Sequence, residues 1–207
     1  MKRIICALFV PLVYFTLIPA FAENDCSEFK ISPEINMTAP QYSEKIERGD
    51  LSGDVMHGNI QASYIEKFGL SAASAPFGDG FCVVLRGLDI ELGYTDFLIK
   101  IDKSHEPGSC EYNMVLKHEQ EHRTVYLSVL DGKKAEIKKT LASAADMIAP
   151  AYVARFDDIN GALDKMQRDL QENPNIILIK QTIDADTEVA NKKIDTRGDS
   201  LRMLKCK

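Results

Sequence analysis

The chain has 207 residues, with 25 Lys and Arg against 31 Asp and Glu, and a formal net charge of −6. This length allows one domain with a sizeable core. The acidic balance and the absence of a clustered basic patch argue against nucleic acid as the main partner, because phosphate binding needs clustered Lys and Arg.

The first 22 residues have the organisation of a secretory signal peptide. Lys2 and Arg3 precede an apolar run that closes on an A-x-A sequence ending at Ala22. This pattern predicts cleavage after Ala22. A membrane anchor is the alternative, since Ile4–Ala22 is barely long enough to span a bilayer, but two prolines interrupt the run. We therefore expect a secreted or periplasmic domain of residues 23–207, with no stable membrane insertion after cleavage.

Four cysteines follow the predicted cleavage point: Cys26, Cys82, Cys110 and Cys206. An even number in an exported chain predicts two disulfides. A cysteine zinc site is the alternative, but no two of them have C-x-x-C spacing. Of the three possible pairings we favour Cys82 with Cys110, which flank a predicted hairpin, and Cys26 with Cys206, which would join the two ends of the chain.

Strand patterns are concentrated in the first half of the chain. Residues 23–75 are polar and rich in turn signals, so only short strands and one short helix are expected there. Apolar and polar residues then alternate on both sides of a predicted turn at 87–89. The alternating segments are 81–85, 90–93 and 97–101. The sequence therefore predicts a small antiparallel sheet of two or three strands.

Helical periodicity replaces this alternation after Pro107. Apolar residues recur at steps of three and four, which predicts a helix over 110–131 with Ser109 as its N-cap. Gly132 is expected to break or bend that helix. Further helical runs are predicted over 133–147, 150–170 and 176–191. The expected fold class is α+β, in which a small antiparallel sheet precedes a helical C-terminal part.

The run from His118 to His122 carries the one chemically suggestive motif, His-Glu-Gln-Glu-His. On a helix, positions i and i+4 share a face, so both imidazoles can bind one Zn²⁺ ion. Glu119 lies about 100° round the helix, where its carboxylate can take a proton from a metal-bound water. The motif therefore predicts zinc on His118 and His122, with Glu119 as the catalytic base.

The alternative is an ordinary helix whose acids are solvated and whose histidines are satisfied by hydrogen bonds. Two of the four histidines in the chain fall on the motif. Both lie on the apolar stripe with Val115 and Val125, where an imidazole needs a partner for its polar nitrogen. These observations favour the metal site.

The sequence leaves the third zinc ligand open. The longer motif with a third histidine is absent, because Val125 and Ser128 stand where its glycine and histidine would be. A downstream carboxylate is the main option, and His57 and His105 are further ones. The candidate carboxylates are Glu136, Asp146, Asp157, Asp158, Asp164 and Asp195.

The run Gly108–Asn113, then Leu116, then the motif His118–His122, resembles the core of the predicted secreted bacterial zinc-dependent proteases, a group filed largely as a domain of unknown function. The resemblance covers about residues 80–130. It implies a zincin-like fold, zinc on the two histidines and Glu119 as general base.

The leading hypothesis is a secreted or periplasmic zinc metallopeptidase that hydrolyses a peptide, protein or cell-wall amide bond. The alternative is an exported, non-catalytic binding or assembly protein with a metallopeptidase-like fold, in which any zinc is structural. A third possibility is a helical interaction module that uses the apolar stripe of residues 156–170.

Overall fold

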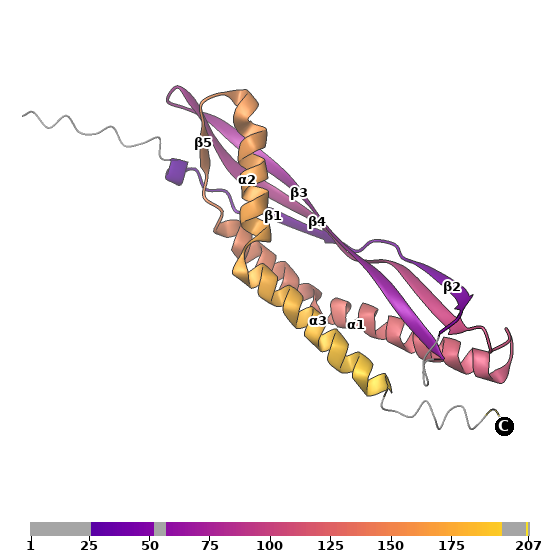
Figure 1. Cartoon of the computed structure of the whole chain (residues 1–207). Coiled ribbons are helices and arrows are strands. Elements are labelled where there is room, and N and C mark those ends of the chain that lie inside the picture. The colour runs from indigo at the N-terminus through magenta and orange to yellow at the C-terminus, as the bar shows by residue number, and fades with distance from the viewer. Residues whose placement is uncertain (1–25, 52–56, 196–205, 207) are drawn as a thin grey trace, which may run out of the picture.

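The computed structural model describes residues 26–51, 57–195 and 206. The predicted signal peptide therefore lies outside the described residues. The described residues form an elongated sheet with helices along one face (Figure 1). The elements in chain order are β1 (Glu34–Thr38), β2 (Ser43–Gly49), β3 (Gly58–Phe77), β4 (Gly80–Asp102), α1 (Cys110–Asp146), β5 (Ala151–Val153), α2 (Ile159–Gln171) and α3 (Pro174–Asp195).

Strand β4 is the centre of a five-stranded sheet. One of its edges pairs with β3 in a long antiparallel hairpin, which reverses at a turn where Gly78 has a φ of 59°. Along the other edge lie β5, which is antiparallel to β4, and then β1 and β2, which are both parallel to it. The prediction of a small antiparallel sheet is therefore wrong. The α+β class holds, but the sheet is mixed and much larger.

The predicted turn at 87–89 is also wrong, because the chain continues through it as one strand. The pairing passes from Ala72 with Leu85 to Ser71 with Gly87, so Arg86 is an extra residue in a β-bulge. A bulge interrupts the inside–outside alternation without ending the strand. Gly87 makes room for the Ser71 side chain of the neighbouring strand, since a Cβ there would lie 2.7 Å from Ser71 Oγ. A second register shift, near Thr95, separates the other two predicted segments.

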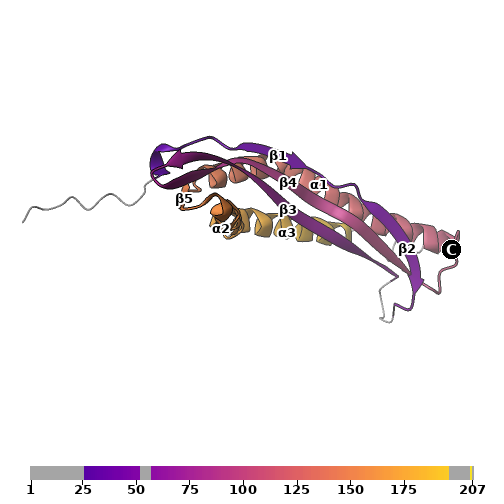
Figure 2. The same cartoon turned by 90° about the horizontal axis from the view of Figure 1, so that it is seen from above.

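The three helices cover one face of the sheet, as the view from above shows (Figure 2). Between the two layers lies the core, and the open face is polar, with a hydrogen bond of 3.0 Å from Asn36 to Asp89 and an ion pair of 2.9 Å between Lys67 and Glu91. Burying apolar surface between the layers is the main stabilising contribution. The core includes Val83, Leu88, Ile90, Phe97, Leu130, Ile137, Leu141, Met166, Leu170, Ile176 and Ile183.

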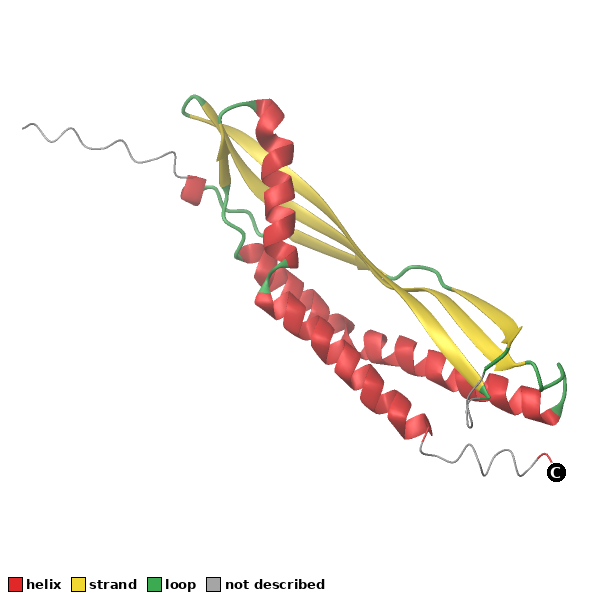
Figure 3. Cartoon of the chain, viewed as in Figure 1, coloured by secondary structure: helices red, strands yellow, loops and turns green. Residues whose placement is uncertain are grey.

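Helix α1 is a single helix of 37 residues, so of the predicted break or bend at Gly132 the break is wrong (Figure 3). Glycine costs a helix about 1 kcal/mol relative to alanine. Here Leu130 and Ile137, on either side of Gly132, are both buried in the core, and this packing outweighs the local preference. The predicted N-cap is confirmed, because Ser109 Oγ accepts a hydrogen bond from the backbone N–H of Tyr112 at 3.1 Å.

The predicted helical run over 150–170 is confirmed only in its second half. Its beginning forms β5 and a 3₁₀ turn at Phe156–Asp158, and α2 starts at Ile159. The last predicted helix corresponds to α3, which runs four residues further than expected, to Asp195. That extension brings Asp195 into ordered helix.

Two disulfides are present, as predicted, but they join Cys26 to Cys82 and Cys110 to Cys206. The favoured pairing of Cys82 with Cys110 is wrong because β4 is one continuous strand, which at about 3.3 Å per residue separates its two ends by roughly 70 Å. The parallel pairing of β1 with β4 instead brings Cys26 beside Cys82. Two disulfides fit a protein of an extracellular or periplasmic compartment. Among the described residues, no helix is both long and apolar enough to cross a bilayer.

Candidate metal centre

Helix α1 places His118 and His122 one turn apart with their rings facing each other. Their Nε2 atoms are 3.1 Å apart, and the two rings are nearly perpendicular, with centroids 4.7 Å apart. The side chains are only 12% and 10% exposed. The i, i+4 spacing of the motif therefore produces a pair of converging imidazoles, as predicted from helix geometry.

Asp195, the last residue of α3, supplies a carboxylate to the same point. Its Oδ1 lies 3.0 Å from His122 Nε2 and 3.5 Å from His118 Nε2. Ligand atoms from these three residues all lie within 4.8 Å of one another. Asp195 is one of the six carboxylates that the sequence left open as third ligand, and the fold brings it to the histidines.

Packing between α1 and α3 explains why Asp195 reaches this position. Buried isoleucines of α3, among them Ile179 and Ile183, belong to the same core as Ile137 of α1. An ion pair of 3.2 Å between Lys133 and Asp186 adds a polar contact between the two helices. Since Asp186 lies beside Lys133 and Asp195 beside His122, the helices run antiparallel. The C-terminal end of α3 therefore lies beside the N-terminal half of α1.

The other five candidate carboxylates lie elsewhere. Glu136 pairs with Lys133 at 3.3 Å, and Asp158 pairs with Arg155 at 3.2 Å. The exposed acids Asp146, Asp157 and Asp164 complete the set. Among the described residues, the histidines and carboxylates close enough together to share one ion are His118, His122 and Asp195.

The remaining two histidines form a pair of their own. His57 Nδ1 lies 3.0 Å from His105 Nε2, and the contact is exposed to solvent. This pair joins the start of β3 to the segment that precedes α1. His57 and His105 do not belong to the group formed with Asp195.

The chemistry of this donor set fits zinc. Tetrahedral Zn²⁺ binds nitrogen and oxygen at 2.0–2.2 Å, which puts neighbouring ligand atoms roughly 3.3 Å apart. The three separations among the His118, His122 and Asp195 donor atoms are 3.0, 3.1 and 3.5 Å. Lone pairs that converge at such distances repel one another unless a proton or a metal ion lies between them. Two imidazoles and a carboxylate are also a ligand set that zinc enzymes use.

The side chain of Glu119 extends from α1 towards the start of β3. Its side chain is almost fully buried, with 5% exposed. A Cβ placed on Gly58 would lie 2.8 Å from Glu119 Oε1 and 2.5 Å from Cγ1 of Val115, so the glycine makes room for the carboxylate. Glu119 is not one of the three residues that could share the ion. Glu119 follows His118 directly on α1, and its carboxylate faces Gly58 at the start of β3.

Asn191, a polar neighbour of the site, was not predicted from the sequence. Asn191 of α3 places its side-chain oxygen 2.9 Å from His122 Nδ1. Its spacing offers a signal, because Asn191 lies four residues before Asp195 and so shares its helix face. The sequence alone does not reveal which helix α3 packs against, so the spacing could not link Asn191 to His122.

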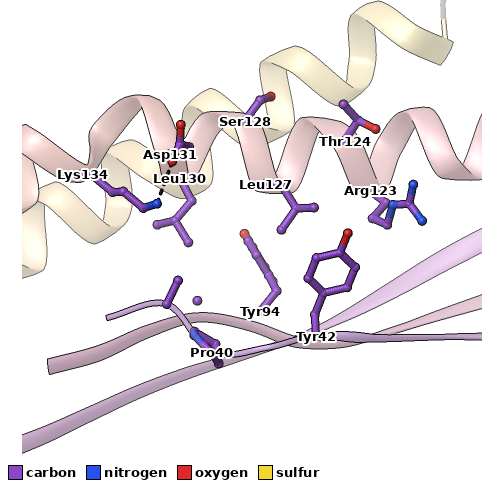
Figure 4. Close-up of a pocket in the computed structure, with 12 residues that line it drawn as sticks. Pro40, Tyr42, Tyr94, Arg123, Thr124, Leu127, Ser128, Leu130, Asp131 and Lys134 are labelled. Carbon is purple, nitrogen blue, oxygen red and sulfur yellow. Dashed lines mark hydrogen bonds and ion pairs between the residues drawn. The ribbon is translucent and has the colours of Figure 1, made fainter. Parts of the chain in front are cut away.

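A groove on another face of α1 takes no part in this centre. It has a volume of about 460 Å³ and lies between α1 and the segment joining β1 to β2 (Figure 4). Two tyrosines line it, Tyr42 and Tyr94, and burial raises the pKa of Tyr94 to about 12. Its cations are neutralised, since Arg123 pairs with Glu44 and Lys134 with Asp131.

The chain was compared with protein-family models, with curated proteins and with solved structures, and none of them matches it. The resemblance to the predicted secreted zinc-dependent proteases therefore stays a prediction that rests on the motif residues.

Proposed function

We propose that this chain is an exported zinc-dependent hydrolase of the metallopeptidase type, with the metal bound by His118, His122 and Asp195. The observation that carries the proposal is the position of Asp195. A carboxylate from a different helix meets two converging imidazoles at distances of 3.0 and 3.5 Å. If the motif occurred by chance on a surface helix, no carboxylate from another helix would be expected at the two histidines.

Exposure at the site supports a catalytic metal over a structural one. Structural zinc is usually enclosed by four protein ligands, whereas catalytic zinc has three and an open position. Three donors converge here, and the Asp195 side chain is 57% exposed while the two histidines are nearly buried. Within the described residues, the site is therefore open on the side on which α3 ends.

The protein residues have distinct roles in this proposal. When bound, zinc supplies a Lewis acid and lowers the pKa of a bound water. His118 and His122 bind through Nε2, and Asp195 completes the ligand set. Glu119 accepts a proton from the attacking water and passes it to the leaving amine. The proposed substrate is a peptide, protein or cell-wall amide, and the proposed route out of the cell is the signal peptide of residues 1–22.

One observation favours a second candidate, a non-catalytic exported binding or assembly protein with structural zinc. The carboxylate of Glu119 packs against Gly58, as does the Val115 side chain, and this burial also suits a role in joining α1 to β3. Zinc would then fasten the end of α3 to α1. The two candidates differ in what Glu119 does.

The test compares four forms of the purified mature chain (residues 23–207): wild type, the His118→Ala/His122→Ala double variant, Glu119→Gln and Glu136→Gln. The last is a matched control, because it makes the same change on the same helix at an exposed acid. Zinc content and hydrolysis of unfolded protein and of peptidoglycan are measured for each form.

A hydrolase should bind about one zinc per chain. The double variant should lose the metal, and Glu119→Gln should keep the metal but lose turnover, while Glu136→Gln should match the wild type. Zinc without turnover on these substrates, together with a Glu119→Gln variant of altered stability, would favour the structural candidate. Absence of zinc from the wild type after metal is added back would overturn both.

A further inference from the structure

The surface of α3 that faces α1 changes character along its length. Its buried residues begin with Ile176, Ile179 and Ile183 and end with Thr187. The same helix face continues at steps of four through Asn191 to Asp195. Apolar packing therefore holds the first half of α3, whereas the last two turns meet α1 through an amide and a carboxylate directed at the histidine pair.

The contact of Asn191 with His122 bears on the protonation of that ring. Nδ1 of His122 lies 2.9 Å from Asn191 Oδ1, and Nε2 faces His118 and Asp195. A neutral imidazole carries one proton, on either Nδ1 or Nε2. An amide oxygen can only accept a hydrogen bond, so this contact places the proton on Nδ1. Nε2 then presents its lone pair to the point where the three donor atoms converge.

We propose that Asn191 is a positioning residue for the metal centre, which fixes His122 in the Nδ1-protonated tautomer and fixes the orientation of its ring. The inference rests on the proposed metal site but adds a residue outside the ligand set. Histidine ligands of metals commonly donate their second N–H to a carbonyl or carboxylate oxygen, and loss of that acceptor typically lowers metal affinity about 10–100-fold. His118 and Asp195 remain the other ligands, so Asn191 acts only through His122.

The chain offers three informative substitutions. Asn191→Leu keeps the approximate size but removes the acceptor. Asn191→Asp keeps an acceptor at the same place and, as a carboxylate, cannot donate a hydrogen bond when ionised. Thr187→Val is the matched control, because Thr187 is buried and lies one turn before Asn191 on the same face of α3.

The experiment measures zinc affinity of the purified mature chain by competition with a chromogenic chelator, and reads the ring protonation of His122 from two-bond ¹H–¹⁵N correlations. Asn191→Leu should bind zinc about 10–100-fold more weakly and should show a mixture of His122 tautomers without metal. Asn191→Asp should retain wild-type affinity or exceed it and keep the Nδ1-protonated form. Thr187→Val should match the wild type in both measurements.

Wild-type zinc affinity in Asn191→Leu would overturn the proposal. Equal losses in Asn191→Leu and Asn191→Asp would also overturn it, because packing and not the acceptor would then be what matters. Failure of the metal site itself is distinguishable, since the wild type and the His118→Ala/His122→Ala variant would then bind zinc equally poorly, and that outcome overturns both proposals.

Discussion

Gly58 lies so close to Glu119 that a Cβ on the glycine would stand 2.8 Å from the Glu119 Oε1 atom. The two residues come from different layers: Gly58 is the first residue of β3, and Glu119 lies in the third turn of α1. The absence of a side chain at position 58 therefore sets how closely the sheet approaches the helix at the proposed catalytic base.

Substitution of Gly58 by alanine should lower the free energy of unfolding by about 1–3 kcal/mol, the usual cost of overpacking. The new methyl group would meet Cγ1 of Val115 at 2.5 Å, so either the strand or the helix has to move. Urea unfolding followed by circular dichroism measures the change. Gly132→Ala is the control, because nothing lies within 4 Å of a Cβ there, and it should raise stability by about 0.5–1 kcal/mol. Equal effects of the two substitutions would contradict the packing shown by the fold.

Replacement of Asp195 by asparagine should weaken zinc binding at least as much as the roughly 10–100-fold loss typical of residues outside the ligand set. The amide keeps the shape of the side chain but removes the charge that complements the cation. Asp164→Asn is the control, since Asp164 is an exposed acid on α2. Chelator competition measures both affinities. If the two variants bind zinc as the wild type does, Asp195 is not a ligand.

Acid should remove a contribution to stability that depends on Asp102. Backbone N–H groups of Leu51 and Ser104 donate to its carboxylate at 3.0 and 2.9 Å. Hydrogen bonds from Ser104 and then Leu51 lower the pKa of Asp102 from its usual 3.8 to about 2. Because the folded pKa lies below the unfolded one, the contribution is present above about pH 4 and is lost as the pH falls towards 2.

The Asp102→Asn variant lacks this ionisation. Its stability should therefore fall short of the wild type above about pH 4, and the gap should close as the pH approaches 2. Chemical unfolding at several pH values gives the gap directly. A gap that stays constant through this range would show that the carboxylate is not held in its ionised form by these hydrogen bonds.

Removal of either disulfide should cost about 2–4 kcal/mol, and slightly more for Cys110–Cys206, because the cost grows with the length of the closed loop. The two bonds span 96 and 56 residues. Thermal and urea unfolding of the Cys110→Ala/Cys206→Ala and Cys26→Ala/Cys82→Ala variants under oxidising conditions tests this. No loss of stability in either variant would argue that its disulfide does not constrain the unfolded chain.

Features set by neighbours in the sequence were predictable, and features set by distant segments were not. The N-cap at Ser109 and the convergence of His118 with His122 depend on spacing within one helix. The choice of Asp195 among six carboxylates depends on how α3 packs against α1, which no local pattern reveals. The disulfide pairing likewise depends on the parallel placement of β1 beside β4.

Two local signals were misleading because tertiary contacts override them. Gly87 suggested a turn, yet it lies in a continuous strand where the Ser71 side chain of the neighbouring strand approaches closely. Gly132 suggested a helix end, yet the buried residues on both sides keep α1 continuous. A glycine permits a turn or a helix end but does not require one, and only the packing of distant segments decides whether the chain changes direction there.

The parallel pairing of β1 and β2 with β4 also constrains the order of folding. Both strands leave the ribosome, or cross a membrane, before the strand that they pair with, and the whole of β3 separates them from it. Until β4 follows, their hydrogen-bonding groups have no place in the sheet, and exposed strand edges of this kind promote aggregation. A chain released N-terminus first would therefore form the β3–β4 hairpin before β1 and β2 could join the sheet, and truncations that remove most of β4 should leave these two strands unpaired.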